Sequence, residues 1–160
     1  MTIKIGERIP SVDLWHMQDG DRVSVKSDQL FAGKRTALFA LPGAFTSTCS
    51  AKHLPGFVNK SDEITGRGID QIVCLSVNDA NVMDAWGKQH GADGKVLMVS
   101  DGNAEYSRAI GLEVDLSVVG MGIRSQRYSM IIDDGVVEQL NLEAPGDYKV
   151  SGPETILASL

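Results

Sequence analysis

The sequence is poor in cysteine and in long apolar runs, and it has no excess of basic residues. It holds two cysteines among 160 residues, too few to staple a secreted scaffold. There is no C-x-x-C pair and no Cys/His spacing typical of zinc, so we expect neither a metal nor another cofactor. The net charge of −6 argues against general nucleic-acid binding, which needs a basic face. No apolar run approaches the ~20 residues of a membrane span.

The segment MTIKIGERIP lacks both the charged-then-apolar pattern of a signal peptide and the Arg/Ser-rich character of a transit peptide. We therefore expect a cytoplasmic location. The length and the hydrophobic content of 42% suit one domain with a sizeable core. Because no repeat, linker or low-complexity tract occurs, we expect a single domain over residues 1–160.

Apolar runs alternate with helical patterns along most of the chain. An early hairpin is predicted around Asp19-Gly20, a common hairpin turn. Contiguous apolar runs predict buried strands. The predicted strands are 36–41, 71–77, 95–100, 127–133 and 136–140; the predicted helices run from 49 toward 59 with an interruption at Pro55-Gly56, over 62–65, after Asn78-Asp79, from Asn103 to Gly111 and over 153–160, and 118–123 is a predicted glycine-rich link. This order predicts an α/β fold with a central mixed sheet and helices on both faces.

The most informative segment is TALFALPGAFTSTCSAKHLPGF, residues 36–57. Pro42-Gly43 ends the first buried strand, and Thr46-Ser47-Thr48 can cap a helix. Cys49 then falls in the first helical turn, where unpaired N–H groups and the helix dipole favour thiolate. Such settings lower a cysteine pKa from ~8.5 into roughly the 3.5–7.5 range. The alternative is that Cys49 is a small buried apolar residue.

The order P-x-x-x-T-x-x-C, within PGAFTSTCSAKHLPGF, resembles the peroxidatic-cysteine motif of the peroxiredoxins, and the longer string resembles their type II subgroup. The resemblance implies a thioredoxin fold with an N-terminal extension, and a homodimer. It also implies a thiol-dependent peroxidase that reduces hydrogen peroxide and alkyl hydroperoxides through a sulfenic acid on Cys49.

The resemblance assigns further roles near Cys49. The Thr46 hydroxyl can reach the sulfur or the peroxide, and it can also serve as a helix cap. Pro42 could shield the sulfur from water or simply mark the turn. The family places an arginine on a later strand, and the match is Arg127 in RYSMIIDDG. Arg124 is the competing candidate, and either arginine could instead be a solvated surface charge.

The roles of His53 and Cys74 stay open. His53 lies one helical turn after Cys49, and we expect it to belong to the pocket or an interface and not to be the base. Cys74, inside the second buried strand, is either a core cysteine or the resolving thiol that plant-like type II enzymes carry at this spacing. The C-terminal resolving cysteine of the animal enzymes is missing from DYKVSG, residues 147–152. We therefore expect an external reductant, glutathione with glutaredoxin or thioredoxin, to act first.

Two other functions compete with the peroxidase. One is a non-catalytic thioredoxin-like binding or chaperone module with structural cysteines, which the set Pro42, Thr46, Cys49 and Arg127 disfavours. The other is a cysteine hydrolase that uses Cys49 with His53, which lacks a recognisable third group to orient the histidine.

Overall fold

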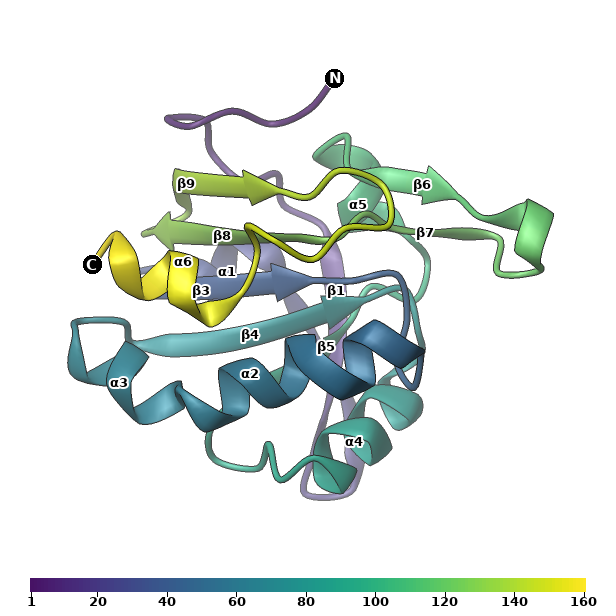
Figure 1. Cartoon of the computed structure of the whole chain (residues 1–160), viewed down its shortest axis with the longest axis horizontal. Coiled ribbons are helices and arrows are strands. Elements are labelled where there is room, and N and C mark those ends of the chain that lie inside the picture. Colours follow the sequence, from purple (N-terminus) through teal and green to yellow (C-terminus); the bar gives the residue numbers. More distant parts are fainter.

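The computed structural model describes the backbone of residues 1–160 and every side chain except that of Cys49. Its centre is a seven-stranded sheet with the strand order β2-β1-β5-β4-β3-β8-β9 (Figure 1). The elements are β1 (Asp13–Gln18), β2 (Asp21–Lys26), α1 (Ser27–Phe31), β3 (Arg35–Ala40), the π-helix η1 (Cys49–His53), α2 (Leu54–Asn59), α3 (Ser61–Gly66), β4 (Gln71–Ser76), α4 (Ala80–Gln89), β5 (Leu97–Ser100), α5 (Glu105–Ala109), β6 (Glu113–Asp115), the 3₁₀ helix η2 (Ser117–Val119), β7 (Ile123–Ser125), β8 (Tyr128–Asp133), β9 (Val136–Leu142) and α6 (Pro153–Ala158).

The sheet is mixed, as the sequence predicted. Strands β3, β4 and β5 are parallel, whereas β1 and β8 run antiparallel to their neighbours in that central group. The central strands are buried on both faces, which accounts for their contiguous apolar residues.

Helices cover both faces of the sheet (Figure 1). Residues of α2, α3, α4 and α6 form one buried cluster with the residues of β3 and β4 that face them. Residues of α1 and α5 form the second cluster with the alternate residues of β3 and β4. The alternation along β3 is visible in its side chains, since Phe39 belongs to the first cluster and Leu38 to the second.

The early hairpin joins β1 and β2 as predicted. Asp19 and Gly20 take φ values of 53° and 84°, the left-handed conformation that a two-residue hairpin turn requires. The helix predicted after Asn78-Asp79 is α4, and Asp79 caps it, because its side chain accepts a hydrogen bond from the Val82 amide at 3.0 Å.

Three details differ from the sequence prediction. The helical segment changes from π-helix to α-helix at Leu54, so Pro55 lies in the first turn of α2 and does not interrupt it. The predicted link 118–123 lies largely inside a small antiparallel hairpin of β6 and β7. Arg127 falls one residue before β8, so this strand begins one residue later than predicted.

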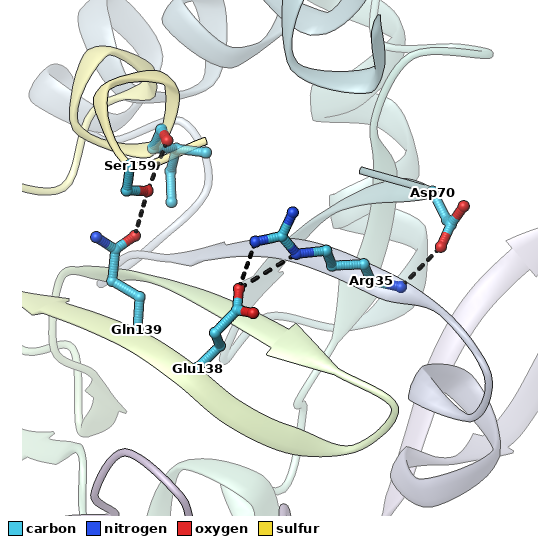
Figure 2. Close-up of polar contacts among 6 residues, drawn as sticks. Arg35, Asp70, Glu138, Gln139 and Ser159 are labelled. Carbon is cyan, nitrogen blue, oxygen red and sulfur yellow. Dashed lines mark hydrogen bonds and ion pairs between the residues drawn. The ribbon is translucent and has the colours of Figure 1, made fainter. Parts of the chain in front are cut away.

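Side chains also connect strands that are not neighbours. Arg35 on β3 donates two hydrogen bonds to Glu138 on β9, at 3.2 and 2.7 Å, across the intervening β8 (Figure 2). The Arg35 amide donates to Asp70, which precedes β4. These contacts lie at the amino end of β3, opposite the loop that leads to Cys49. In the described part of the chain, no helix is both long and apolar enough to cross a membrane.

Candidate active site

The loop after β3 is anchored to the end of β4. The Ser76 hydroxyl lies 3.1 Å from the Leu41 carbonyl oxygen and 2.8 Å from the Asn78 side-chain oxygen, so its one hydrogen is shared between these two acceptors. That Asn78 oxygen also accepts the Ala44 amide at 2.9 Å. Because parallel strands end at the same edge of the sheet, these polar side chains fix the loop that carries Pro42.

A tight turn then leads into the helical segment. Phe45 has φ 63°, an unfavourable value for a non-glycine residue, and its side chain is half exposed. The Thr46 hydroxyl donates to the Gly43 carbonyl at 2.7 Å, and the Thr46 carbonyl accepts the Ser50 amide at 2.8 Å. The hydroxyl oxygen keeps acceptor capacity toward the start of the helix.

The backbone of Cys49 lies in the first turn of the helical segment, where the sequence predicted it. Its side chain lies outside the described residues, so the reactivity of its sulfur stays a prediction. The next residue is tied down from a distance, since the buried Trp86 indole donates to the Ser50 hydroxyl at 2.9 Å.

Arg127 and His53 meet beside this segment. An Arg127 guanidinium nitrogen, Nη1, lies 2.8 Å from His53 Nδ1, and His53 Nε2 lies 3.0 Å from the Ser151 carbonyl oxygen. The His53 ring is fully buried against the rings of Phe39 and Tyr148, with centroid distances of 4.9 and 5.1 Å.

These partners fix the proton on His53. A guanidinium only donates and a carbonyl only accepts, so Nδ1 is the acceptor and Nε2 carries the hydrogen. Burial, together with the nearby Arg127 charge, lowers the pKa of His53 to about 3. His53 is therefore neutral at pH 7, and its lone pair faces Arg127. This geometry suits a pocket residue and disfavours a general base or a hydrolase partner for Cys49.

Arg124 has a different environment. Its Nε donates to the Met121 carbonyl at 2.8 Å, and its Nη1 donates to the Pro42 carbonyl at 3.4 Å. A Cβ at Gly43 would lie 3.1 Å from this guanidinium, so Arg124 packs closely on the loop backbone. We therefore assign Arg124 to holding the β7 end against that loop.

A cavity of about 380 Å³ opens beside Pro42 and Arg127. Its wall combines apolar and polar side chains from the loop after β3, the β6 end and the segment after β9. The lining residues are Pro42, Thr48, Val114, Leu116, Gln126, Arg127, Glu143, Ala144, Pro145, Gly146 and Asp147. The cavity lies next to the first helical turn, because Thr48 and Arg127 both line it.

Cys74 lies in the middle of β4 and is fully buried. It is paired in register with Phe39 on β3 and Met98 on β5, and it belongs to the core cluster that α2 covers. It therefore shares a sheet face with the helical segment of Cys49.

The sequence prediction missed the residues that hold His53. The Ser151 carbonyl accepts from His53, and the Glu143 carboxylate accepts from Ser151. A signal existed in the Asp133-Asp134-Gly135 turn, because a hairpin there brings the end of β9 back beside Arg127.

The fold and this site define a thioredoxin-fold thiol protein with a helix-borne cysteine and a nearby, partly buried arginine. The family model described as Redoxin matches residues 4–157. Peroxiredoxin-2E, chloroplastic, of Arabidopsis thaliana is 48% identical over 99% of this chain and 70% of its own length. Peroxiredoxin-2B of the same plant is 42% identical over 99% of this chain and 98% of its own.

A solved structure shows the same similarity in three dimensions. Reduced Prx3 of Vibrio vulnificus in complex with H2O2 has a TM-score of 0.95 and 47% identity, and 99% of each chain is covered. The chain therefore belongs to the peroxiredoxin family, in its type II group, and its function is that of a thiol-dependent peroxidase.

Proposed function

We propose that this peroxiredoxin reduces hydrogen peroxide and small alkyl hydroperoxides with Cys49 as the attacking thiol. The observation that carries the proposal is the cavity beside the Cys49 helical turn, which Pro42, Thr48 and Arg127 line together. A thiolate, hydrogen-bond donors for the developing charge, and a site that aligns the S–O–O atoms are what the reaction needs.

In the proposed step, the Cys49 thiolate attacks one peroxide oxygen and the O–O bond breaks. The sulfur is oxidised by two electrons to a sulfenic acid, and the other oxygen leaves as hydroxide or alkoxide and takes a proton. Arg127 stabilises the thiolate and the charge that moves onto the peroxide oxygens. Thr46 offers its hydroxyl oxygen as an acceptor, and Pro42 limits the access of water.

The cavity wall supports organic hydroperoxides as substrates in addition to hydrogen peroxide. The cavity wall that contains Arg127 also has apolar surface, which is provided by Val114, Leu116, Ala144 and Pro145. An alkyl group can pack there while the peroxide group stays near the guanidinium.

The sulfenic acid then needs a thiol. We propose that an external thiol, glutathione with glutaredoxin or thioredoxin, condenses with it first, releasing water and leaving a mixed disulfide that a second thiol reduces. The full burial of Cys74 within β4 supports this order. Cys74 would resolve Cys49 only if the Cα atoms came within ~7 Å or the helical segment unwound.

The assembly and location are proposals of the same kind. We propose a homodimer, which is supported by exposed apolar side chains at Phe45, Val118 and Val119, with exposed fractions of 50, 92 and 66%. Light scattering at several concentrations would reveal a monomer if this is wrong. We also propose a cytoplasmic location.

The central experiment follows the Cys49 thiol after one equivalent of hydrogen peroxide. We expect loss of that thiol far faster than loss of free cysteine, and a sulfenic acid detectable by mass spectrometry. A rate like that of free cysteine would leave the non-catalytic module as the function. A Cys49–Cys74 bridge, formed without added thiol, would assign resolution to Cys74.

A further inference from the structure

Glu143 holds an unusual position for a carboxylate at the end of a strand. It follows β9, and only 6% of the residue is exposed. One of its oxygens, Oε2, accepts the Lys149, Val150 and Ser151 amides, each at 2.8 Å, and the Ser151 hydroxyl at 2.7 Å. The segment 149–151 is therefore wrapped around one anionic oxygen.

The charge on this carboxylate is stable. Burial acts to raise the pKa of Glu143, but the Ser151 hydroxyl and the three amides outweigh it, and the pKa is lowered. Glu143 is thus ionised at neutral pH, and its hydrogen bonds are of the strong, charge-assisted kind.

The wrapped segment orients the group that holds His53. Ser151 is fully buried, and its carbonyl accepts the His53 Nε2 hydrogen at 3.0 Å. That bond places the ring's only lone pair on Nδ1, which accepts from Arg127 at 2.8 Å. The orientation of the Ser151 carbonyl therefore selects the His53 tautomer whose Nδ1 accepts a hydrogen bond from the Arg127 guanidinium.

A backbone hydrogen bond also links Glu143 to Arg127. The Glu143 amide donates to the Arg127 carbonyl at 3.0 Å. Glu143 thus contacts the main chain of Arg127 directly and reaches its side chain through Ser151 and His53.

We infer that Glu143 is a positioning residue for peroxide reduction: its carboxylate fixes segment 149–151, so that Ser151 and His53 hold the Arg127 guanidinium at the cavity. The inference rests on the proposed roles of Cys49 and Arg127. Glu143 acts through other residues, although part of it also lines the cavity.

The test compares Glu143→Gln with Glu138→Gln in otherwise wild-type protein. Glu143→Gln keeps the size and one acceptor oxygen but removes the charge, and we expect the second-order rate with hydrogen peroxide to fall by about 10–100-fold. Glu138 lies on the same β9, and its carboxylate binds Arg35 on the surface. We expect the rate of Glu138→Gln to stay within about twofold of wild type.

A spectroscopic readout separates positioning from general stability. The chain has three histidines, so a long-range ¹H–¹⁵N spectrum contains three ring systems, and His53→Gln identifies one of them. We expect the wild-type His53 ring to be a single neutral Nε2–H tautomer from pH 5 to 8. In Glu143→Gln we expect a tautomer mixture or exchange broadening at His53.

Each outcome decides the question. A wild-type rate for Glu143→Gln overturns the inference, and so does a lowered rate with an unchanged His53 spectrum, because Glu143 would then act directly on the cavity. If Glu143→Gln does not fold, Ser151→Ala removes one of the four bonds, and Ser151→Thr restores its hydroxyl. A smaller loss of rate in Ser151→Ala, recovered in Ser151→Thr, supports the relay, and no difference between the two refutes it. If the wild type reacts no faster than free cysteine, the proposed function fails. The His53 spectrum still tests whether Glu143 fixes the His53 tautomer through Ser151.

Discussion

The two arginines near the loop after β3 give the sharpest test of the active site. We expect Arg127→Ala to lower the second-order rate with hydrogen peroxide by about 10²–10³-fold, the cost of one preorganised donor at a developing charge. Arg124→Ala removes two bonds to backbone carbonyls, one of them 3.4 Å long, in a partly exposed position. Water can replace such bonds, so we expect a loss of less than about tenfold.

The assay is the pseudo-first-order loss of the Cys49 thiol, in competition with a second peroxide-reactive reporter. Arg127→Lys serves as the graded variant, because it keeps a charge but loses the planar fork, and we expect its rate to lie between those of wild type and Arg127→Ala. Equal losses in Arg127→Ala and Arg124→Ala would mean that the wrong cation has been assigned.

Stability has to be separated from chemistry in this comparison. Arg127→Ala removes the donor to the buried His53 Nδ1, and an unsatisfied buried acceptor costs about 1–3 kcal/mol. Urea unfolding of each variant gives this cost directly. Rates are then compared below the start of each transition, where both variants are folded.

Other predictions concern stability and local structure. The His53 pKa is about 3 in the folded state and about 6.5 in the unfolded state, so the unfolded state binds more protons between these pH values. We therefore expect the unfolding free energy to fall from pH 6.5 toward pH 4, by at most about 1.4 kcal/mol per pH unit. A flat profile, or the same fall in His53→Gln, would refute this. Ser50→Ala leaves the buried Trp86 indole N–H without its partner, so we expect the unfolding free energy measured in urea to fall by about 1–3 kcal/mol and the Trp86 fluorescence to change. Unchanged stability and fluorescence would contradict a role for the Trp86–Ser50 hydrogen bond. Arg35→Ala should lower the unfolding free energy by about 1 kcal/mol or less, because its ion pair with Glu138 is partly exposed. A larger loss in urea unfolding would show that this pair stabilises the fold more than an exposed ion pair does.

Much of the fold follows from the sequence because its local signals agree with its burial pattern. Asp19-Gly20 sets a hairpin turn, and contiguous apolar runs mark strands covered on both faces. The strand–turn–helix around Cys49 follows in the same way from Pro42-Gly43 and the hydroxyl residues after it. The π-helix was not predictable, because its hydrogen-bond pattern depends on tertiary contacts and not on local preference.

The roles of Arg124 and Arg127 could not be separated by spacing alone. Both are partly buried, and they lie only three residues apart. The small β6–β7 hairpin separates them. It ends at Ser125 and directs Arg124 onto the Pro42 carbonyl, whereas Arg127 lies at the entrance to β8 beside His53. Its two strands are only three residues long each, and the segment had no sequence signal stronger than its glycines.

The position of Glu143 depends on a feature that no local pattern shows. From the Asp133-Asp134-Gly135 turn, regular pairing of Asp133 with Val136 would extend to Arg127 opposite Leu142. A bulge between Ile131 and Ile132 shifts the register, so Tyr128 pairs with Leu142 and Glu143 lies beside Arg127. One extra residue in a strand therefore places a carboxylate, and not a leucine, beside the arginine of the cavity. Deleting Glu138, the extra residue, removes the bulge but leaves Gln139 opposite Ile131, so the rest of β9 keeps its register and Glu143 stays beside Arg127. We therefore expect the folded deletion variant to keep the single His53 tautomer and its peroxide reactivity. Loss of both would show that the bulge itself, and not only the register, holds Glu143 in place.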